Sequence, residues 1–484
     1  MKRTLIALLS IGLCLSSVAG CKEAGTPSPS STPTTVSTSS ESESTQPNGE
    51  LDWQIGSDTP SSFVASGGST LSGQGTTVSK SSGNGTTQGP HATVNPEKNY
   101  ETTIWTSGDE PYLMQAILEF QKNNKNVKVM PVNAANRTVS ALKTAMAAKN
   151  APDMVLMDQV YIGTLGQQGL TYDLARFGAG GLKSKYIPSC WNAVTNGNTV
   201  YGLPFSGNVL IMVYNKSVFS AAGVQIPKTY DELRNVSRTI KSVTGKPAFL
   251  PAVIALDNTN DANYSAFFFA TWLWRNGGEL ISSDGKKAVF NSDAGVKAAE
   301  QIVDLLKDGT ATRSGGEADV YNGNIGMIQL GTWVTQYMTG PNKQGDLGVF
   351  MLPELKAGVP QYSGLGLGAL CITTSCKAPE AAYKFLEFYS TSMKYQIQST
   401  RDKYNTICGM PSLVGGKDQP EYNSDVWKTF FDQFEVAKAR PTVDGWEYIE
   451  VSIARALTRI AEGKDAREQL NAAVEEANRI LARN

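Results

Sequence analysis

The chain has 484 residues, of which 40% are hydrophobic, and a formal net charge of −1. This length can bury one large core or two ordinary ones and favours more than one folding unit. The near-neutral charge, without a basic run, argues against a nucleic-acid partner, whose phosphates need clustered Lys and Arg. The single histidine, His91, lies in a polar N-terminal segment, so the rest of the chain has no Ser-His-Asp or Cys-His mechanism and no histidine metal site. We expect neither a metal nor a cofactor.

The first 20 residues have the features of a secretion signal. Lys2-Arg3 precedes an apolar run from Leu5 to Leu15, which is too short to span a bilayer, and residues 18–20 are small. Cys21 follows these small residues at once. This arrangement resembles a bacterial lipobox, which implies that Cys21 becomes the lipidated first residue of the mature protein. The alternative is an ordinary secretory signal followed by a chance cysteine.

Residues 21–98 predict a disordered linker, because Ser, Thr, Gly, Pro, Asn and Gln dominate and few residues could enter a core. A flexible coil of about 75 residues has a root-mean-square reach of roughly 45–50 Å. Such a linker would hold a globular body away from a membrane anchor at Cys21.

Order is expected from about Tyr100, and the first elements predict an α/β fold. Strands at 102–106, 127–132 and 153–157 alternate with helices at 112–122 and 139–149. Ligands of such sheets lie beyond the carboxyl ends of the strands, which places Asp109 and Asp158 at a pocket rim. The other interpretations are a helix cap for Asp109 and a solvated loop for Asp158.

The segment 201–233 reads as a strand, a turn and a capped helix. The strand is expected at 209–214, and Thr229 is placed to cap a helix whose first turn carries Asp231 and Glu232. Nothing in this segment is catalytic by residue type.

The rest of the chain continues the alternation of helices and strands. The aromatic-rich segment 263–275 predicts a buried helix, and Gly364, Gly366 and Gly368 predict a close backbone crossing, because the third glycine of a dinucleotide fingerprint is missing. We further expect a turn at 409–412, a helix from Trp446 to Ile460, and a last helix capped by Asp465. The cysteines after the linker are expected to be free or structural; they are Cys190, Cys371, Cys376 and Cys408.

Several short motifs together resemble bacterial extracellular solute-binding proteins of sugar ABC transporters, the maltose-binding-protein-like family. The most informative motifs are Tyr201-Gly202-Leu203-Pro204, Tyr214-Asn215-Lys216, Ala222-Gly223 and Pro227-Lys228-Thr229-Tyr230-Asp231-Glu232-Leu233. Further matches are Ala151-Pro152-Asp153, Lys377–Ala382, Gly409–Ser412, Gly463–Leu470 and the run from Gly323 to Trp333. The sequence departs from the family pattern at Gly326, where Ala is usual, and in the length of its linker.

The resemblance implies a periplasmic-binding-protein type II fold: two α/β lobes, three interlobe crossings and a ligand cleft. The crossings are expected near Asn208, Gly364 and Val414. The N-lobe would then comprise residues 99–207 and 364–415, and the C-lobe residues 208–363 and 416–484.

The resemblance also suggests which residues bind a ligand. Sugars lie on aromatic rings and take hydrogen bonds from polar side chains. Trp333 and Trp446 match positions of stacking aromatics, Asp109 and Asp158 match the N-lobe rim, and Asn208 lies at the first crossing. For both tryptophans a core position is the alternative. Weaker candidates are Glu110, Tyr161 and Tyr264; for Tyr264, core burial is the favoured interpretation.

The resemblance therefore implies a binding protein rather than an enzyme. It would capture a carbohydrate, most readily an oligosaccharide, by lobe closure and deliver it to the permease subunits of an ABC importer. We expect a monomer anchored at the outer face of the cytoplasmic membrane. A binding protein of the same fold for another solute, such as a polyamine, and an extracellular glycosidase remain the alternatives.

Overall fold

The computed structural model describes residues 94–106, 110–134, 138–251, 259–402 and 404–483. The expected signal peptide, the expected lipidation site Cys21, nearly all of the expected linker and Asp109 lie outside these residues. Within the described residues, no helix is both long and apolar enough to cross a lipid bilayer.

The first sheet contains the strands that the N-terminal alternation predicted. Strand β1 (Tyr100–Thr106) pairs in parallel with β2 (Val127–Asn133) and β3 (Met154–Asp158). The sheet order is β12-β6-β11-β3-β1-β2, and β13 also pairs with β11. The remaining strands of this sheet are β6 (Leu203–Val209), β11 (Ser363–Ile372), β12 (Met410–Pro411) and β13 (Ala437–Ala439).

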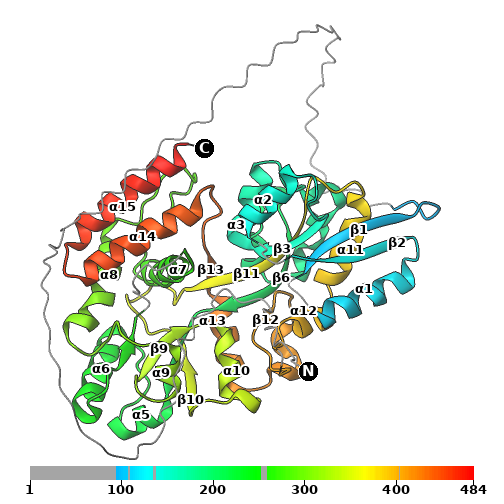
Figure 1. The fold of residues 1–484 in the computed structure, drawn as a ribbon. Coiled ribbons are helices and arrows are strands. Elements are labelled where there is room, and N and C mark those ends of the chain that lie inside the picture. The colour runs from blue at the N-terminus through cyan, green and yellow to red at the C-terminus, as the bar shows by residue number, and fades with distance from the viewer. Residues whose placement is uncertain (1–93, 107–109, 135–137, 252–258, 403, 484) are drawn as a thin grey trace, which may run out of the picture. The chain divides into compact units, whose positions relative to one another are not determined.

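The second sheet has the order β10-β7-β9-β8. Its strands are β7 (Ile211–Asn215), β8 (Phe249–Leu250), β9 (Met327–Leu330) and β10 (Leu347–Phe350). Helices α7, α8, α14 and α15 pack on one another beside it (Figure 1). A separate two-stranded pair consists of β4 (Thr195–Asn196) and β5 (Thr199–Val200).

The helices follow the apolar periodicity of the sequence. In α1, for example, Leu113, Ile117 and Phe120 are all buried, as their spacing predicts. The α-helices are α1 (Pro111–Asn123), α2 (Val139–Ala147), α3 (Gln159–Gln167), α4 (Pro188–Asn192), α5 (Lys216–Ala222), α6 (Tyr230–Thr244), α7 (Thr259–Arg275), α8 (Asp293–Lys307), α9 (Glu317–Tyr321), α10 (Thr335–Met338), α11 (Pro379–Ser390), α12 (Met393–Ser399), α13 (Asp425–Glu435), α14 (Trp446–Ala461) and α15 (Ala466–Leu481).

The chain passes from the first sheet to the second between β6 and β7, at Leu210. There Leu210 N–H bonds to the carbonyl of Gly364, and the Ser363 hydroxyl donates to the carbonyl of Leu210 at 2.6 Å. The second passage, between β10 and β11, covers residues 351–362. We expected a third passage near Val414, but β13 at 437–439 still pairs with β11, and the chain reaches α14 only after it.

Two expected local structures differ from those observed. The single strand expected at 209–214 is β7, and the residues before Leu210 form a second strand, β6, because that segment continues the first sheet. The turn expected at 409–412 contains β12, which pairs with β6. The four cysteines of the described residues are free, as predicted.

Candidate functional site

Asp158 lies at the carboxyl end of β3 and caps α3. Its Oδ1 accepts a hydrogen bond from the backbone N–H of Val160 at 3.1 Å. Its Oδ2 lies 3.0 Å from Nη2 of Arg440, and its side chain is only 10% exposed. Asp158 is thus a buried helix cap, and the solvated loop proposed as the alternative for this residue is wrong.

Arg440 lies between two carboxylates. Besides Asp158, its Nη1 contacts Glu450 Oε1 on α14 at 3.0 Å, and both side chains of this second pair are at most 3% exposed. The attraction of Asp158 and Glu450 outweighs the opposing effect of burial and raises the pKa of Arg440. Burial raises the pKa of Glu450. We call Asp158, Asn263, Arg440, Trp446 and Glu450 the carboxylate cluster.

Trp446 is buried rather than open to a cleft. Only 1% of it is exposed, and its Nε1 donates to Glu450 Oε1 at 2.7 Å. A stacking aromatic needs a free ring face, whereas Trp446 packs inside the core formed by α7, α8, α14 and α15. The prediction that Trp446 lines a ligand pocket is therefore wrong, and its alternative, a core position, is observed.

Trp333 keeps part of its surface exposed. The chain can fold its ring back over Gly331, because a Cβ on that glycine would lie 1.9 Å from the indole ring. Its Nε1 donates to Glu317 Oε1 at 3.3 Å, and its ring meets that of Tyr264 edge to face, with centroids 6.5 Å apart. We call Tyr264, Glu317, Tyr321 and Trp333 the Trp333 cluster.

Helix α7 joins the two clusters through consecutive residues. Asn263 Nδ2 donates to Glu450 Oε2 at 2.8 Å, while Tyr264 belongs to the Trp333 cluster and its hydroxyl donates to the carbonyl of Gln329. Tyr161, on α3, lies beside the carboxylate cluster. Burial and the charges of Glu450 and Asp158 raise the pKa of Tyr161, so its hydroxyl stays protonated at neutral pH.

The other predicted residues belong to neither cluster. Asn208 lies on β6 opposite Gly366 of β11, and its side chain covers that glycine: a Cβ there would lie 2.5 Å from the Asn208 Oδ1. Glu110 is the residue before α1 and makes no side-chain cap bond to that helix.

Three important polar residues escaped the sequence interpretation. Glu450 could have been found, because it lies four residues after Trp446 and therefore on the same helix face. Asn263 carries no local signal, since its partner Glu450 is 187 residues away. Arg440 carries none either, since Glu450 and Asp158 are 10 and 282 residues away from it.

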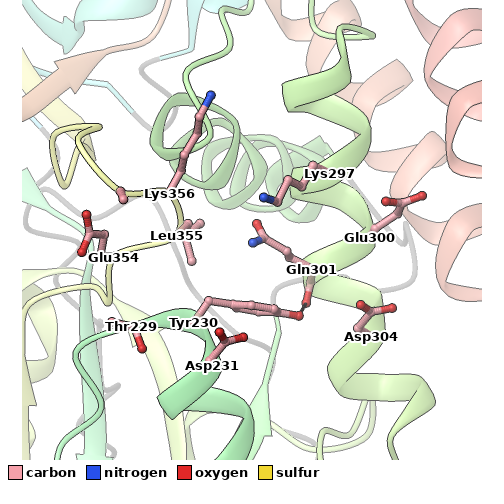
Figure 2. Close-up of a pocket in the computed structure, with 11 residues that line it drawn as sticks. Thr229, Tyr230, Asp231, Lys297, Glu300, Gln301, Asp304, Glu354, Leu355 and Lys356 are labelled. Atoms are coloured by element: carbon pink, nitrogen blue, oxygen red, sulfur yellow. Dashed lines mark hydrogen bonds between the residues drawn. The ribbon is translucent and has the colours of Figure 1, made fainter.

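Metal coordination has no support among the residues that the structure describes: they contain no group of three or more His, Cys, Asp or Glu placed to hold an ion. A pocket of about 470 Å³ lies elsewhere, between the start of α6, α8 and residues 354–357 (Figure 2). It is lined by Tyr230 and Gln301 together with charged side chains of both signs, and it contains no predicted site residue.

Comparison with known proteins agrees with this architecture. A family model for bacterial extracellular solute-binding proteins matches residues 105–395. The maltodextrin-binding protein of Bacillus subtilis (strain 168) is 24% identical over 371 residues, covering 73% of this chain and 83% of that protein.

Solved structures show the same fold. The cyclic alpha-maltosyl-1,6-maltose binding protein of Arthrobacter globiformis superposes with a TM-score of 0.69 at 21% identity, covering 80% of this chain and 100% of that one. A Mycobacterium tuberculosis protein solved in complex with glycerophosphocholine gives 0.65 at 17% identity, covering 79% and 98%. With the family model matching well over half of the chain, this protein belongs to the bacterial extracellular solute-binding protein family and has its two-lobed α/β fold.

Proposed function

We propose that this protein captures a carbohydrate, specifically an oligosaccharide, and delivers it to the permease subunits of an ABC importer. The observation that carries the proposal is the partly exposed ring of Trp333, which packs against Tyr264. The residue before Tyr264 on α7 is Asn263, whose side-chain amide binds the Glu450 carboxylate. A sugar needs this combination, because its C–H faces lie on aromatic rings while its hydroxyls bond to polar groups.

The charges of the site favour a sugar over a phosphate ester. Arg440 is the cation of the carboxylate cluster, and two carboxylates already occupy it. A phosphate would need free donors or positive charge, whereas a neutral sugar needs acceptors for its hydroxyl groups. Asp158, whose side chain is 10% exposed, supplies such acceptors, and Tyr161 supplies a hydroxyl donor.

Capture would proceed by movement of the lobes. Ligand binding shifts the population towards a closed form only if the ligand has a higher affinity for that form. Groups from both lobes would provide this difference: Asp158 from the first sheet, and Tyr264 and Trp333 from the helices and loops around the second. Asn208 and Glu110 remain candidates at the crossing and at the rim.

Isothermal titration calorimetry with malto-, cello-, xylo- and manno-oligosaccharides tests the carbohydrate assignment. We expect one series to bind, and Trp333→Ala to weaken that binding by about 2 kcal/mol, roughly thirtyfold in Kd. Tyr448→Ala is the matched control, because this tyrosine is 64% exposed on α14. The affinity of this variant for the sugar should equal that of the wild type.

The same panel separates the alternatives. No binding of any sugar, together with tight binding of spermidine, would replace the carbohydrate by a polyamine. Release of reducing ends from the oligosaccharides would indicate a glycosidase. We infer no such activity, because the two carboxylates brought together here share one guanidinium.

We further propose that Cys21 carries a lipid that anchors the protein at the outer face of the cytoplasmic membrane, with the body acting as a monomer. Its place directly after Val18-Ala19-Gly20 supports this assignment. Metabolic labelling with a palmitate analogue should mark the wild-type protein in the membrane fraction. Cys21→Ala should lose the label and appear in the medium; labelling that persists in this variant would contradict the anchor.

A further inference from the structure

Residues 440–444 form a strap that connects β13 of the first sheet to α14. The strap lies along β3 and α3 through three successive contacts. Arg440 pairs with Asp158, Thr442 lies against Gly163, and the Asp444 carboxylate accepts a hydrogen bond from Gln168 Nε2 at 2.8 Å. A Cβ on Gly163 would lie 2.1 Å from the Thr442 methyl carbon, so this glycine allows the strap to approach. These contacts hold the segment before α14 against β3 and α3.

One guanidinium in this strap holds an acid from each side of the molecule. Asp158 ends a strand of the first sheet, whereas Glu450 belongs to the helix group beside the second sheet. Arg440 contacts both at 3.0 Å through different nitrogens. Its Cζ also lies 4.7 Å from the centre of the Phe267 ring on α7. Three elements thus surround one planar cation.

The geometry of Arg440 matters more than its charge alone. A guanidinium has five N–H donors in a fixed fork, so its two terminal nitrogens can hold two carboxylates at a set separation. The Nε of Arg440 is buried and finds no hydrogen-bond partner among the described residues. A buried donor left without a partner is costly, which suggests that the fork is retained for its two terminal contacts.

Removal of the guanidinium would leave two buried acids facing each other. Glu450 would keep its bonds from Trp446 and Asn263, but no cation would compensate either carboxylate. Like charges in a buried site repel strongly, so the ends of β3 and α14 would move apart or one acid would take up a proton.

We propose that Arg440 is a positioning residue for ligand capture: by holding Asp158 of β3 and Glu450 of α14 on one guanidinium, it keeps the ligand-facing groups of the two lobes in register for one ligand. The inference rests on the proposed function. Arg440 itself is only 3% exposed and acts through the two acids that it holds.

Calorimetry on Arg440→Lys and Arg440→Met tests the affinity, with maltotetraose or whichever panel sugar the wild type binds most tightly as the probe. Lysine keeps the charge but replaces the fork by a single ammonium, so we expect Kd to rise about tenfold while the unfolding midpoint stays near the wild-type value. A greater loss is expected for Arg440→Met. Arg455→Met is the matched control, because Arg455 lies on α14, as Glu450 does, and its 3.0 Å pair with Glu476 of α15 is 40–44% exposed.

Hydrogen–deuterium exchange of the ligand-free proteins tests the bridge separately. Arg440→Met should exchange faster at 158–163 and at 446–450 than the wild type, and Arg455→Met should not. Wild-type affinity in both Arg440 variants, or unchanged exchange at these two segments, would overturn the inference. If no sugar binds the wild type, the proposed function fails while the exchange experiment still reports on the bridge. Should Arg440→Met not fold, Arg440→Lys carries both measurements.

Discussion

Glu317 shows how one buried acid can orient an aromatic ring. Its two oxygens accept hydrogen bonds from the Tyr321 hydroxyl at 2.7 Å and from Trp333 Nε1, and no salt bridge to it is seen among the described residues. Burial raises the pKa of this carboxyl above its ordinary value of 4.5. The folded state therefore binds the Glu317 proton more tightly than the unfolded state does.

The sign of the resulting pH effect follows from this shift. The contribution of protonated Glu317 to stability is complete below pH 4.5 and is lost as the pH rises through the raised pKa. Glu317→Gln, which keeps an acceptor but cannot ionise, should lose less stability between pH 4 and pH 8 than the wild type. Thermal unfolding across this range checks the difference, with the exposed Glu447→Gln as control. Parallel profiles for wild type and Glu317→Gln would contradict the prediction.

At this scale, the sequence predicted residues whose role is local. Asp465, predicted to cap the last helix, accepts from the N–H of Glu468 three residues on. Asp158 also caps a helix, but the sequence predicted a pocket rim or a solvated loop for it, and its second partner, Arg440, is 282 residues away. The exposed or buried state of the two tryptophans could not be predicted in the same way. Trp446 follows Gly445 and Trp333 lies two residues after Gly331, but whether a ring faces a core depends on helices distant in the sequence, and Trp446 proved to be buried.

Among the elements, α6 offers the clearest test of a predicted cap. Thr229 Oγ1 accepts from the N–H of Glu232 at 3.2 Å, and the Glu232 carboxylate accepts from the N–H of Lys228 at 2.7 Å. Thr229→Ala removes the first of these bonds and should lower the free energy of unfolding by about 1 kcal/mol. Urea denaturation measures the loss.

Thr239→Ala is the control within the same helix. Thr239 is partly exposed within α6, and its hydroxyl donates back to the carbonyl of Asn235. Alanine has the higher helix propensity, so stability should stay constant or rise slightly. An equal loss in both variants would assign the effect to threonine removal in general rather than to the cap.

Helix α3 explains why some elements escaped prediction. Gly163 and Gly166 lower its intrinsic helix propensity, so no helix is predicted there from the local residues. The structure supplies the reason: Thr442 and Tyr201 lie where Cβ atoms on these glycines would be. The requirement is tertiary, whereas the capped and periodic helices α1, α6 and α15 could be identified from their own residues.

For the whole molecule, the strand and helix alternation predicted the fold class, and the family resemblance added the two lobes. The place where the chain finally leaves the first sheet could not be read from composition, because β13 is only three residues long and depends on pairing with residues 363–365. The core also does not divide cleanly: one hydrophobic cluster contains residues of β3, β6 and β11 together with residues of β7, β9 and β10. The lobe boundaries proposed from the sequence therefore run through a shared core.

The second crossing, residues 351–362, depends on one side chain from α13. Gln433 is fully buried; its Oε1 accepts from the N–H of Leu352 at 3.1 Å, and its Nε2 donates to the carbonyl of Gln361 at 2.7 Å. It thus fastens both ends of the crossing. Within the crossing, the Glu354 backbone bonds to Lys228 and Tyr230 at the start of α6. Any movement of one lobe against the other must pass through this fastened segment.

Gln433→Ala would leave the buried N–H of Leu352 without this partner, at about 1–3 kcal/mol, and would also remove the bond to the part-buried carbonyl of Gln361. We expect faster hydrogen–deuterium exchange at 351–362. We also expect a smaller ligand-induced change in the radius of gyration, measured by X-ray scattering, because a loosened crossing would couple the movements of the two lobes less tightly. Gln419→Ala, which removes only a bond to the carbonyl of Gly415, should leave both measurements unchanged. If Gln433→Ala lowers stability while exchange at the crossing and closure match the wild type, Gln433 supports the core and not the hinge.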